Sequence, residues 1–458
     1  MSSRIEEIIE RQRAFFASGA TKKTEFRKEQ LKKLQECIHK YEKEIYDALY
    51  RDLNKAPFEC YATEMGIVLD EINFMLKHLD RWSRPQRVRT PVTQFPSKCF
   101  RVSEPYGVVL VMAPWNYPFQ LSLAPLVGAV AAGNCVILKP SAYAPYTSAV
   151  LSKILRENFS DQFITVIEGG REENAQLLAQ RFDYIFFTGG VTVGKLVMES
   201  AAKHLTPVTL ELGGKSPCIV DETADIKMTA RRLVWGKYLN AGQTCVAPDY
   251  VLVQSSVRDD LIKAMKKEIR RQFGKEPLKN NDYPRIINQK HFERLQGLMK
   301  DTNILEGGTC SEESLKIAPT ILAGVHGESP VMQEEIFGPV LPVLMFDRIE
   351  DAVAFVNRRE KPLALYLFTK NAYSEKLVLE QTSYGGGCIN DTVVHLATPY
   401  MPFGGVGSSG MGCYHGKESF ETFTHKKSIM KKALWPDIPL RYAPYRRLSL
   451  KLLKMIQK

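Results

Sequence analysis

The nine cysteines of this 458-residue chain lack the close spacing of a disulfide or zinc motif. No two of them form a CxxC pair, their number is odd, and they lie far apart along the chain. This distribution argues against a disulfide framework and against a zinc ribbon. We therefore expect a protein of a reducing compartment, the cytoplasm, with no metal site.

The N-terminus also lacks the apolar core of a signal peptide. Residues 3–6, SRIE, instead match a capping box that opens an amphipathic helix ending at Gly19. The one long stretch without charge, residues 105–138, is long enough to suggest a membrane span. Three prolines interrupt it, so we expect a strand, turn, helix and strand buried in an α/β domain.

The net charge of +11 raises the possibility of nucleic-acid binding. Most of this charge lies in the tail from His425 to Lys458, which contains ten Lys or Arg and one Asp. Because the rest of the chain is nearly balanced, we expect no nucleic-acid partner. A solvated surface is the ordinary use of such a tail, and contact with an anionic membrane or a protein is the alternative.

After Pro444 the tail has the pattern of a basic amphipathic helix. The apolar residues of this pattern share a narrow arc and the basic ones lie opposite. The first group is Tyr445, Leu448, Leu452, Met455 and Ile456, and the second is Arg447, Lys451, Lys454 and Lys458. We expect the apolar stripe to pack on the protein's own surface, with peripheral membrane contact as the alternative.

Hydrophobic periodicity predicts an α/β fold with two units. Residues 24–53 carry apolar side chains at steps of three to five, which predicts one long core-packed helix. Between residues 102 and 211, five β-rich runs alternate with helical stretches, as in a parallel sheet. Residues 212–394 alternate in the same way and include a predicted helix at 257–273. The glycine-rich segment 402–413 predicts a loop close to another backbone.

A glycine turn follows one of the predicted strands. In FFTGGVTVGK, residues 186–195, the glycines precede a helix and could bring backbone N–H groups to a phosphate. The GxxxxGK spacing also fits a nucleoside-triphosphate site, but position 196 is Leu where magnesium requires Ser or Thr. A dinucleotide pyrophosphate needs no such hydroxyl, and a turn used only for packing is the alternative.

Single polar residues mark other strand ends. Lys139, in ILKPS, could donate to ribose hydroxyls or a phosphate, although most such lysines are only solvated. Glu211, in TLELGGK, lies in an apolar strand, where desolvation would raise its pKa towards that of a general base unless it forms a salt bridge. Asn116, in APWNYP, could donate to a developing oxyanion or be an ordinary turn residue. Glu335 and Phe337, in MQEEIFGPV, could bind a sugar diol and stack, or form a surface turn.

These motifs, with GQTCVAPD around Cys245 and PFGGVGSSGMG, occur in the order and spacing of the aldehyde dehydrogenase superfamily. The chain resembles the class 3 branch, the fatty or aromatic aldehyde dehydrogenases, from about residue 5 to residue 430. The resemblance implies an α/β fold with a Rossmann-like cofactor domain, an α/β catalytic domain and a small oligomerisation arm. The implied boundaries are 1–83 and 102–211 for the cofactor domain, 212–394 for the catalytic domain, 84–101 and 395–425 for the arm, and 426–458 for the basic tail.

The resemblance also implies the roles of individual residues. Cys245 is the nucleophile, and because a free thiol has a pKa near about 8.5 we expect its surroundings to lower that pKa. The Asn116 amide and the Cys245 N–H stabilise the oxyanion, and Glu211 activates water. The implied cofactor residues are Trp115, Lys139, Thr188, Gly189, Gly190, Gly194, Leu212, Gly213, Glu335 and Phe337. The implied substrate pocket is Tyr117, Trp235, Thr244 and Phe403.

One position departs from the pattern of the superfamily. Relatives carry glutamate after KPS, which binds the adenosine ribose and repels a 2′-phosphate, whereas this chain has Ala142. We therefore expect NAD and NADP to be accepted comparably. The resemblance further implies a homodimer. We also expect residues 444–457 to form a helix over the substrate entrance that favours medium- or long-chain aliphatic or aromatic aldehydes.

Two other functional classes fit part of the pattern. Cys245 paired with one of the eight histidines would make an acyl transferase or hydrolase. A binding or structural protein could also retain the fold without activity. Glu211 and the cofactor-like turns disfavour the first class, and the joint presence of Cys245, Glu211 and Asn116 disfavours the second.

Overall fold

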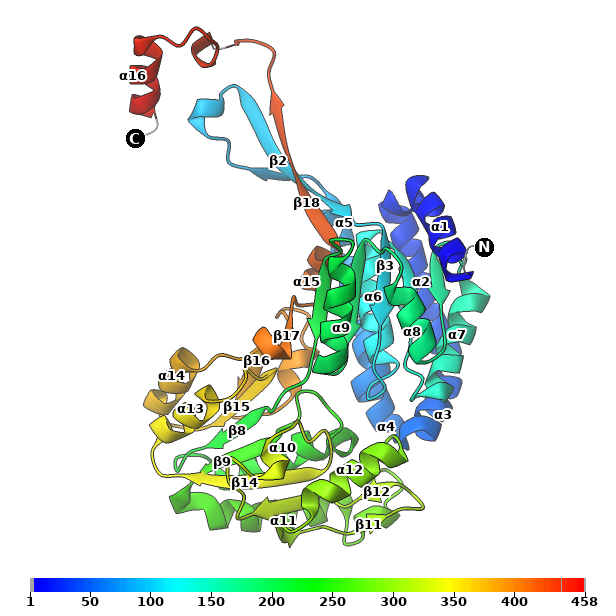
Figure 1. The fold of residues 1–458 in the computed structure, drawn as a ribbon, viewed down its shortest axis with the longest axis vertical. Coiled ribbons are helices and arrows are strands. Elements are labelled where there is room, and N and C mark those ends of the chain that lie inside the picture. The colour runs from blue at the N-terminus through cyan, green and yellow to red at the C-terminus, as the bar shows by residue number, and fades with distance from the viewer. Residues whose placement is uncertain (1–3, 438, 457–458) are drawn as a thin grey trace.

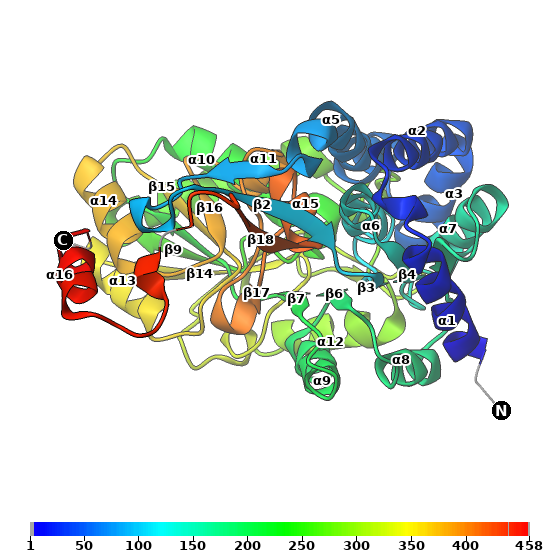
Figure 2. The same ribbon diagram turned by 90° about the horizontal axis from the view of Figure 1, so that it is seen from above.

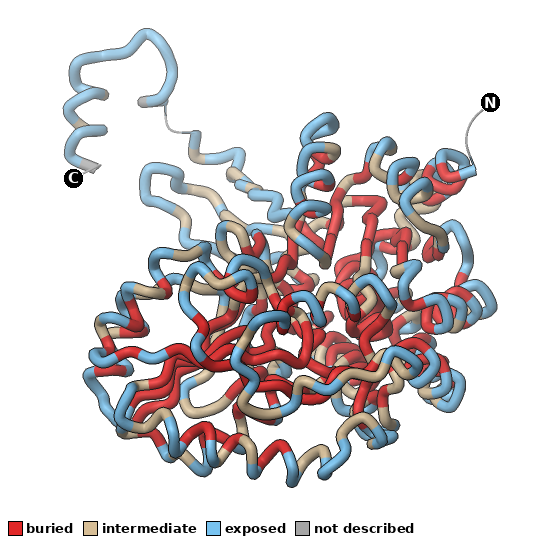
Figure 3. The backbone as a smooth tube through the Cα atoms, turned by 60° about the horizontal axis from the view of Figure 1, so that its bottom comes forward, coloured by how far each residue is buried: buried red, intermediate tan, exposed pale blue. Residues whose placement is uncertain are grey.

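Two mostly parallel sheets, each covered by helices, form the body of the protein, and a narrow three-stranded arm projects from it (Figure 1). The structure is a computed structural model and describes residues 4–437 and 439–456. The two α/β units expected from the sequence are present. Buried aliphatic and aromatic side chains fill both units. Figure 3 shows in red where the buried residues lie along the backbone.

The chain begins with a layer of helices that packs against the first sheet. The first helix, α1, ends two residues before Gly19, whose φ of 78° stops it as expected. The prediction of one helix over residues 24–53 is wrong, because the backbone leaves helical geometry at Tyr41, with φ −100° and ψ 13°. The helices are α1 (Arg4–Ala17), α2 (Thr24–Lys40), α3 (Glu42–Leu53), α4 (Pro57–Cys60) and α5 (Gly66–Ser83), with a π-helical turn η2 (Tyr61–Met65) before α5.

The first sheet has six strands in the order β17-β7-β6-β3-β4-β5, and only β17 is antiparallel to its neighbour. Its strands are β3 (Val108–Met112), β4 (Cys135–Lys139), β5 (Ile164–Val166), β6 (Tyr184–Thr188), β7 (Val208–Glu211) and β17 (Gly410–Met411). The helices between them are α6 (Gln120–Ala132), α7 (Pro145–Asn158), α8 (Arg171–Leu178) and α9 (Val191–Ala202).

The uncharged stretch 105–138 forms β3, α6 and β4, as expected. Every residue of α6 is buried between the sheet and neighbouring helices, which explains why this helix has no polar face. Among residues 4–437 and 439–456, no helix combines the length and apolar character needed to cross a membrane.

The second sheet has seven strands in the order β10-β13-β14-β9-β8-β15-β16, with β10 antiparallel. Its strands are β8 (Pro217–Val220), β9 (Tyr250–Gln254), β10 (Asn303–Glu306), β13 (Thr320–Ala323), β14 (Val340–Phe346), β15 (Ala364–Phe368) and β16 (Gly386–Ile389). Its helices are α10 (Ile226–Tyr238), α11 (Arg258–Phe273), α12 (Gln289–Met299), α13 (Ile349–Asn357) and α14 (Ala372–Gln381), and a small hairpin pairs β11 (Cys310–Ser311) with β12 (Lys316–Ile317).

The arm is an antiparallel sheet of β1 (Gln86–Val88), β2 (Ser97–Pro105) and β18 (Thr424–Lys432). Its third strand therefore lies largely in the segment that the sequence assigns to the tail. Much of the segment 395–425 lies in the body instead, because β17 pairs with β7 and Phe420, in α15 (Lys417–Thr422), is buried beside α6.

The tail helix α16 (Arg447–Ile456) lies at the far end of the arm, away from both sheets (Figure 1). Seen from above, it lies at the end of the view opposite the N-terminus (Figure 2). The expectation that its apolar stripe packs on the chain's own surface is wrong: Leu448 is 67% exposed, Met455 66% and Tyr445 81%. For the same reason α16 does not cover a substrate entrance of its own chain. The Pro-rich linker after β18 carries the helix away from the body.

Candidate active site

The carboxyl ends of the first sheet bring most of the candidate residues to one edge. Lys139 ends β4, Thr188 ends β6 and Glu211 ends β7, and Thr188 is directly opposite Glu211 in the β6–β7 register. The turn after β3 carries Trp115 and Asn116 along the same edge. Because parallel strands all end on one side of their sheet, residues as far apart in sequence as Asn116 and Glu211 lie along the same edge.

The turn that carries Cys245 comes from the second unit and meets this edge. It follows the short helix η4 (Leu239–Gly242), in which Asn240 and Ala241 both have a φ of 51°. Such left-handed geometry is costly for residues with a Cβ, so it persists only where surrounding contacts hold it. The Asn116 amide nitrogen donates to the Gln243 carbonyl across 3.1 Å, which joins the two units beside Cys245.

Cys245 is partly exposed, and its thiol is strongly held in the protonated form. Burial raises its pKa from 9.0 to about 12, the negative charges of Glu335 and Glu211 raise it further, and the backbone N–H groups of residues 245 and 246 oppose the shift. The sequence-based expectation of a lowered pKa is therefore wrong. Attack on a carbonyl requires that the thiol proton leave during the reaction.

Glu211 is buried, and neither of its carboxylate oxygens has a hydrogen-bond partner among the described residues. The salt bridge considered as its alternative role is absent from the described part of the chain. Desolvation raises the pKa of Glu211 well above its ordinary value. A carboxyl without a partner and with a raised pKa has the properties of a general base, since it binds a proton strongly once ionised.

Asn116 is fixed by hydrogen bonds on both its backbone and its side chain. Its carbonyl accepts from Asn240 Nδ2 at 2.7 Å and from Lys55 Nζ at 3.0 Å. One N–H of its amide is used by the Gln243 carbonyl, and the amide has a second N–H. That second N–H can donate to an oxyanion formed at Cys245, because the first bond already fixes the amide plane.

The glycine turn after β6 fits a phosphate-bearing ligand. Gly190 caps α9 in an extended conformation and has open space where a Cβ would be, whereas a Cβ on Gly194 would lie 2.7 Å from Leu212. The helix therefore packs tightly on β7 while its first turn remains accessible. The buried Thr188 hydroxyl has no partner among the described residues, so it can bond a ligand at this edge. Gly189 is held by its N–H, which donates to the Glu211 carbonyl at 3.0 Å.

Lys139 and the segment around Glu335 supply further polar groups. The buried Lys139 ammonium donates to the carbonyls of Pro140 and Gly169, at 2.8 and 2.7 Å, which leaves it one more N–H for a ligand. The Glu335 carboxyl closely approaches Gly213, where a Cβ would lie 2.0 Å from its oxygen. Burial is the main cause that raises the pKa of Glu335 to about 8.

Aromatic residues line the space next to these polar groups. The Trp115 and Phe337 rings pack edge to face with centroids 5.3 Å apart, and His291 lies 5.1 Å from the Trp115 ring. Leu212 is held by its N–H, which donates to the Ser409 carbonyl at 3.0 Å. Hydrogen-bond donors, an aromatic wall and an accessible helix N-terminus together fit a dinucleotide such as NAD or NADP.

The predicted substrate-pocket residues are only partly brought together. Tyr117 and Thr244 share a 2.6 Å hydrogen bond between hydroxyls next to Cys245. Phe403 is buried and packs on Tyr414, with ring centroids 5.8 Å apart. Trp235 lies on α10 with 40% of its surface exposed. Among the described residues it makes no ring contact or hydrogen bond with Tyr117, Thr244 or Phe403.

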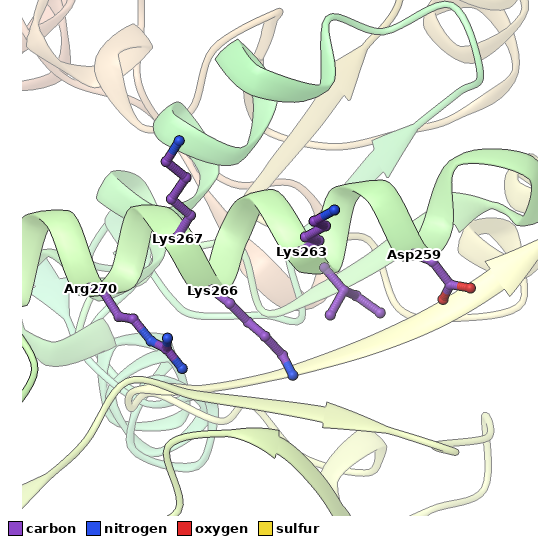
Figure 4. Close-up of a pocket in the computed structure, with 6 residues that line it drawn as sticks. Asp259, Lys263, Lys266, Lys267 and Arg270 are labelled. Carbon is purple, nitrogen blue, oxygen red and sulfur yellow. The ribbon is translucent and has the colours of Figure 1, made fainter.

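A surface hollow elsewhere contains none of these residues. Its lining residues all come from α11, and Figure 4 shows them spread along that helix from Asp259 to Arg270. The hollow is therefore separate from the candidate site.

Several buried or half-buried residues near the site were not found from the sequence. They are Lys55, Glu59 and Glu64 from the N-terminal helical layer, and Asn240, Gln243 and His291 from the second unit. Charged residues at helical positions ordinarily face solvent, so no pattern in residues 55–64 indicated their burial. Only Gly242, the first residue of GQTC, could have indicated the tight turn that orients Asn240 and Gln243; its φ there is 74°.

The histidine-dependent alternative lacks a partner for Cys245. Among the described residues the cysteine that contacts a histidine is Cys388, whose Sγ lies 3.6 Å from His395 Nδ1. Burial raises the pKa of Cys388 and lowers that of His395 to about 4, so this pair is not an activated thiolate–imidazolium pair.

This fold, with its glycine turn, unpartnered polar groups and aromatic wall at one sheet edge, is that of a dinucleotide-dependent dehydrogenase. Residues 2–429 match the model of the Aldehyde dehydrogenase family, and the chain belongs to that family. It is an NAD(P)-dependent enzyme that oxidises aldehydes to carboxylic acids.

Similar proteins match over nearly the whole chain. The 4,4'-diaponeurosporen-aldehyde dehydrogenase of Staphylococcus aureus (strain NCTC 8325 / PS 47) is 50% identical over 444 residues, which cover 96% of this chain and 97% of that protein. The dimeric NADP-preferring aldehyde dehydrogenase of Canis lupus familiaris is 46% identical over 445 residues, covering 96% and 98%. A solved structure of the substrate-bound state of Staphylococcus aureus AldH has a TM-score of 0.98 and 49% identity, covering 100% of both chains.

Proposed function

We propose that Cys245 is the nucleophile, Asn116 the oxyanion donor and Glu211 the general base of aldehyde oxidation in this chain. The observation that carries the proposal is the junction of the two units. There the partly exposed Cys245 thiol lies within electrostatic reach of Glu211, a buried carboxyl without a partner among the described residues, and beside the fixed Asn116 amide with its spare N–H. In the first step the sulfur bonds to the aldehyde carbon, the carbonyl π electrons move to oxygen, and the thiol proton leaves to a neighbouring base.

The amide of Asn116 and the N–H of Cys245 then stabilise the negative oxygen of the thiohemiacetal. When bound, NAD(P)+ supplies the hydride acceptor for the carbon, which leaves a thioester on Cys245. Glu211 takes a proton from water as the water oxygen attacks that thioester, and cleavage of the C–S bond releases the carboxylic acid.

Replacement of the nucleophile tests this assignment. Cys245→Ser should lower kcat for aldehyde oxidation by at least about a thousandfold, because a serine hydroxyl without an activated base is a poor nucleophile. Cys388→Ser, which removes the cysteine that contacts histidine, is the matched control and should keep the parent rate. Parent-like oxidation by Cys245→Ser would overturn the assignment, and loss of activity in the control alone would assign the reaction to Cys388 and His395 instead.

We also propose that the enzyme accepts NAD and NADP comparably. Ala142 is exposed and carries no charge at the position after KPS, so no carboxylate there repels a 2′-phosphate. Some similar proteins are named NADP-preferring. Steady-state kcat/KM values for both cofactors test the proposal, and a preference of more than about tenfold for NAD would contradict it.

For the substrate we propose medium- or long-chain aliphatic or aromatic aldehydes. Tyr117 and Phe403 are apolar or aromatic groups near the site, and one similar protein is named for 4,4'-diaponeurosporen-aldehyde. A series of aldehydes from two to twelve carbons tests the idea by kcat/KM. The value should rise with chain length, since each buried methylene contributes about 0.8 kcal/mol; a flat series would count against it.

We propose a homodimer assembled through the arm. The strands β1, β2 and β18 project away from the body with little cover of their own, and some similar proteins are named dimeric. Sedimentation equilibrium should give twice the chain mass. A chain that remains monomeric at micromolar concentration would refute this assembly.

We further propose a cytoplasmic enzyme whose tail makes peripheral contact with anionic membranes. The exposed apolar residues of α16 are accompanied by basic residues and by Trp435, which is 84% exposed. Co-sedimentation with vesicles should require anionic lipid, weaken at high salt and disappear on truncation at Pro444. Equal binding to neutral vesicles, or none to anionic ones, would refute the contact.

A further inference from the structure

A fully buried ion pair lies behind the candidate active site, outside the set of residues found from the sequence. Lys55, in the loop after α3, and Glu64, in the π-helical turn η2, have side chains with 0% exposure and lie 2.5 Å apart. Burying two charges costs several kcal/mol for each ion unless both are paired and their remaining hydrogen-bond capacity is filled. The groups that fill the remaining hydrogen-bonding capacity of Lys55 and Glu64 therefore indicate the role of the pair.

Both members of the pair spend their remaining hydrogen bonds on the turn that carries Asn116. Lys55 Nζ donates to the Asn116 carbonyl at 3.0 Å and lies 3.9 Å from the centroid of the Tyr117 ring. The second oxygen of Glu64 accepts from the backbone N–H groups of Phe119 and Gln120, at 3.0 and 2.9 Å. The pair thus holds the segment 116–120 from two sides.

The opposite side of the Asn116 turn is held by the second unit. Asn240 Nδ2 donates to the Asn116 carbonyl and, at 3.1 Å, to the Gln243 carbonyl, which also accepts from the Asn116 amide. Glu59, on α4, accepts from the Asn240 backbone N–H at 2.9 Å. The Asn116 carbonyl is therefore a shared acceptor between the N-terminal helical layer and the turn that leads to Cys245.

We propose that Lys55 and Glu64 are positioning residues that fix the Asn116 amide relative to Cys245. This inference rests on the proposed role of Asn116 as oxyanion donor. Neither residue touches substrate or cofactor in this arrangement; both act through the 116–120 turn. Loss of either member leaves its partner buried without a counter-charge, so the turn shifts and the spare amide N–H no longer points at the oxyanion.

The expected loss of kcat follows from the contribution that an oxyanion donor makes to catalysis. Removing the donor itself, in Asn116→Ala, should lower kcat by about 10²–10³-fold. Displacing it, in Lys55→Met or Glu64→Gln, should lower kcat by roughly 10–100-fold, because a shift of about 1 Å in a catalytic group costs up to two orders of magnitude. KM for the aldehyde should change by less than about threefold, since the amide acts on a charge that forms only in the reaction.

A double-mutant cycle separates positioning from general destabilisation. If Lys55 acts through Asn116, Lys55→Met should have almost no further effect in an Asn116→Ala background. The matched control is Arg27→Met, which removes another buried cation that donates only to backbone carbonyls and Ser83, far from Asn116. Arg27→Met should lower the melting temperature but keep kcat per folded molecule.

The outcomes distinguish failure of the proposed oxyanion role of Asn116 from failure of the positioning role of Lys55 and Glu64. If Asn116→Ala keeps the parent kcat, the proposed oxyanion role fails, and the positioning role fails with it. If Asn116→Ala lowers kcat but Glu64→Gln and Lys55→Met fold and keep the parent kcat, only the positioning inference is overturned. Multiplicative effects of Lys55→Met and Asn116→Ala on kcat in the double mutant would also overturn it. Should Lys55→Met not fold, Lys55→Met/Glu64→Leu removes both charges and can regain stability; parent-like kcat in that variant would also overturn the inference.

Discussion

The protonation of Cys245 leads to a direct prediction for the enzyme without cofactor. Its thiol pKa is raised from 9.0 to about 12, chiefly by burial. Each pKa unit is a factor of ten in thiolate at pH values below the pKa, so the three-unit rise leaves Cys245 about a thousandfold less ionised than an ordinary thiol at pH 7. Only the thiolate is alkylated, so the rate of alkylation reports this fraction.

Iodoacetamide labelling of Cys245, followed by mass spectrometry of its peptide, measures the effect. We expect the rate to lie about three orders of magnitude below that of free cysteine at pH 7 and to rise about tenfold per pH unit up to pH 10. Glu335→Gln should label faster than the parent enzyme, and the gap should open above about pH 8, where the Glu335 carboxyl ionises and its charge opposes the thiolate.

Two results would refute this account of Cys245. The first is rapid labelling at pH 7 that does not vary with pH, which would require a thiolate already present in the free enzyme. The second is slower labelling of Glu335→Gln than of the parent enzyme above pH 8, which would mean that the carboxylate favours the thiolate. Intact-fold controls by circular dichroism at each pH exclude exposure of Cys245 by unfolding.

Three further substitutions test the neighbouring groups. Glu211→Gln should keep a stoichiometric burst of reduced cofactor but lose about 10²–10⁴-fold in steady-state kcat, because the thioester forms and is not hydrolysed; loss of the burst itself would place Glu211 elsewhere in the reaction. Ala142→Glu should lower kcat/KM for NADP relative to NAD by at least about tenfold through like-charge repulsion, and an unchanged ratio would contradict the proposed location of the 2′-phosphate. Gly213→Ala adds a Cβ 2.0 Å from a Glu335 oxygen, so that carboxyl must move; we expect a raised KM for the cofactor with little change in melting temperature, and an unchanged KM would argue that Glu335 does not hold the cofactor.

The strands and turns of the site could be predicted because their signals are local. Short apolar runs followed by Gly or Pro gave β3, β4, β6 and β7 with their ends at Lys139, Thr188 and Glu211. Parallel topology then requires that these ends share one edge. Fold class and the strand-end positions of the candidate residues were therefore accessible without coordinates.

The remaining features depend on contacts distant in sequence. Nothing local distinguishes Tyr41 from its helical neighbours, so the break between α2 and α3 was missed. The sequence of the arm strand β18 is rich in lysine, which is typical of a solvated tail. In the structure this strand instead pairs with β2 over residues 97–105. The raised pKa of Cys245 likewise follows from burial and from two carboxyls that lie 34 residues before it and 90 after it.

Burial affects the ionisable groups of the site in two opposite ways. The effect depends on whether the group has a charged or hydrogen-bonding partner. Glu211 has no partner among the described residues, so a low-dielectric environment favours its neutral form and makes it a stronger base once it ionises. The partners of Lys55 and Glu64 are an opposite charge and the backbone of one turn, so the same environment strengthens their contacts and makes the turn rigid. If Glu211 and the Lys55–Glu64 pair have the roles proposed above, the group that takes up a proton during the reaction is left unpaired among the described residues, and the groups that hold geometry are fully hydrogen-bonded. Under these roles, a substitution that gave Glu211 a buried cation would lower its pKa and its strength as a base, and one that took the cation from Glu64 would loosen the turn, so catalysis would be slower in either case.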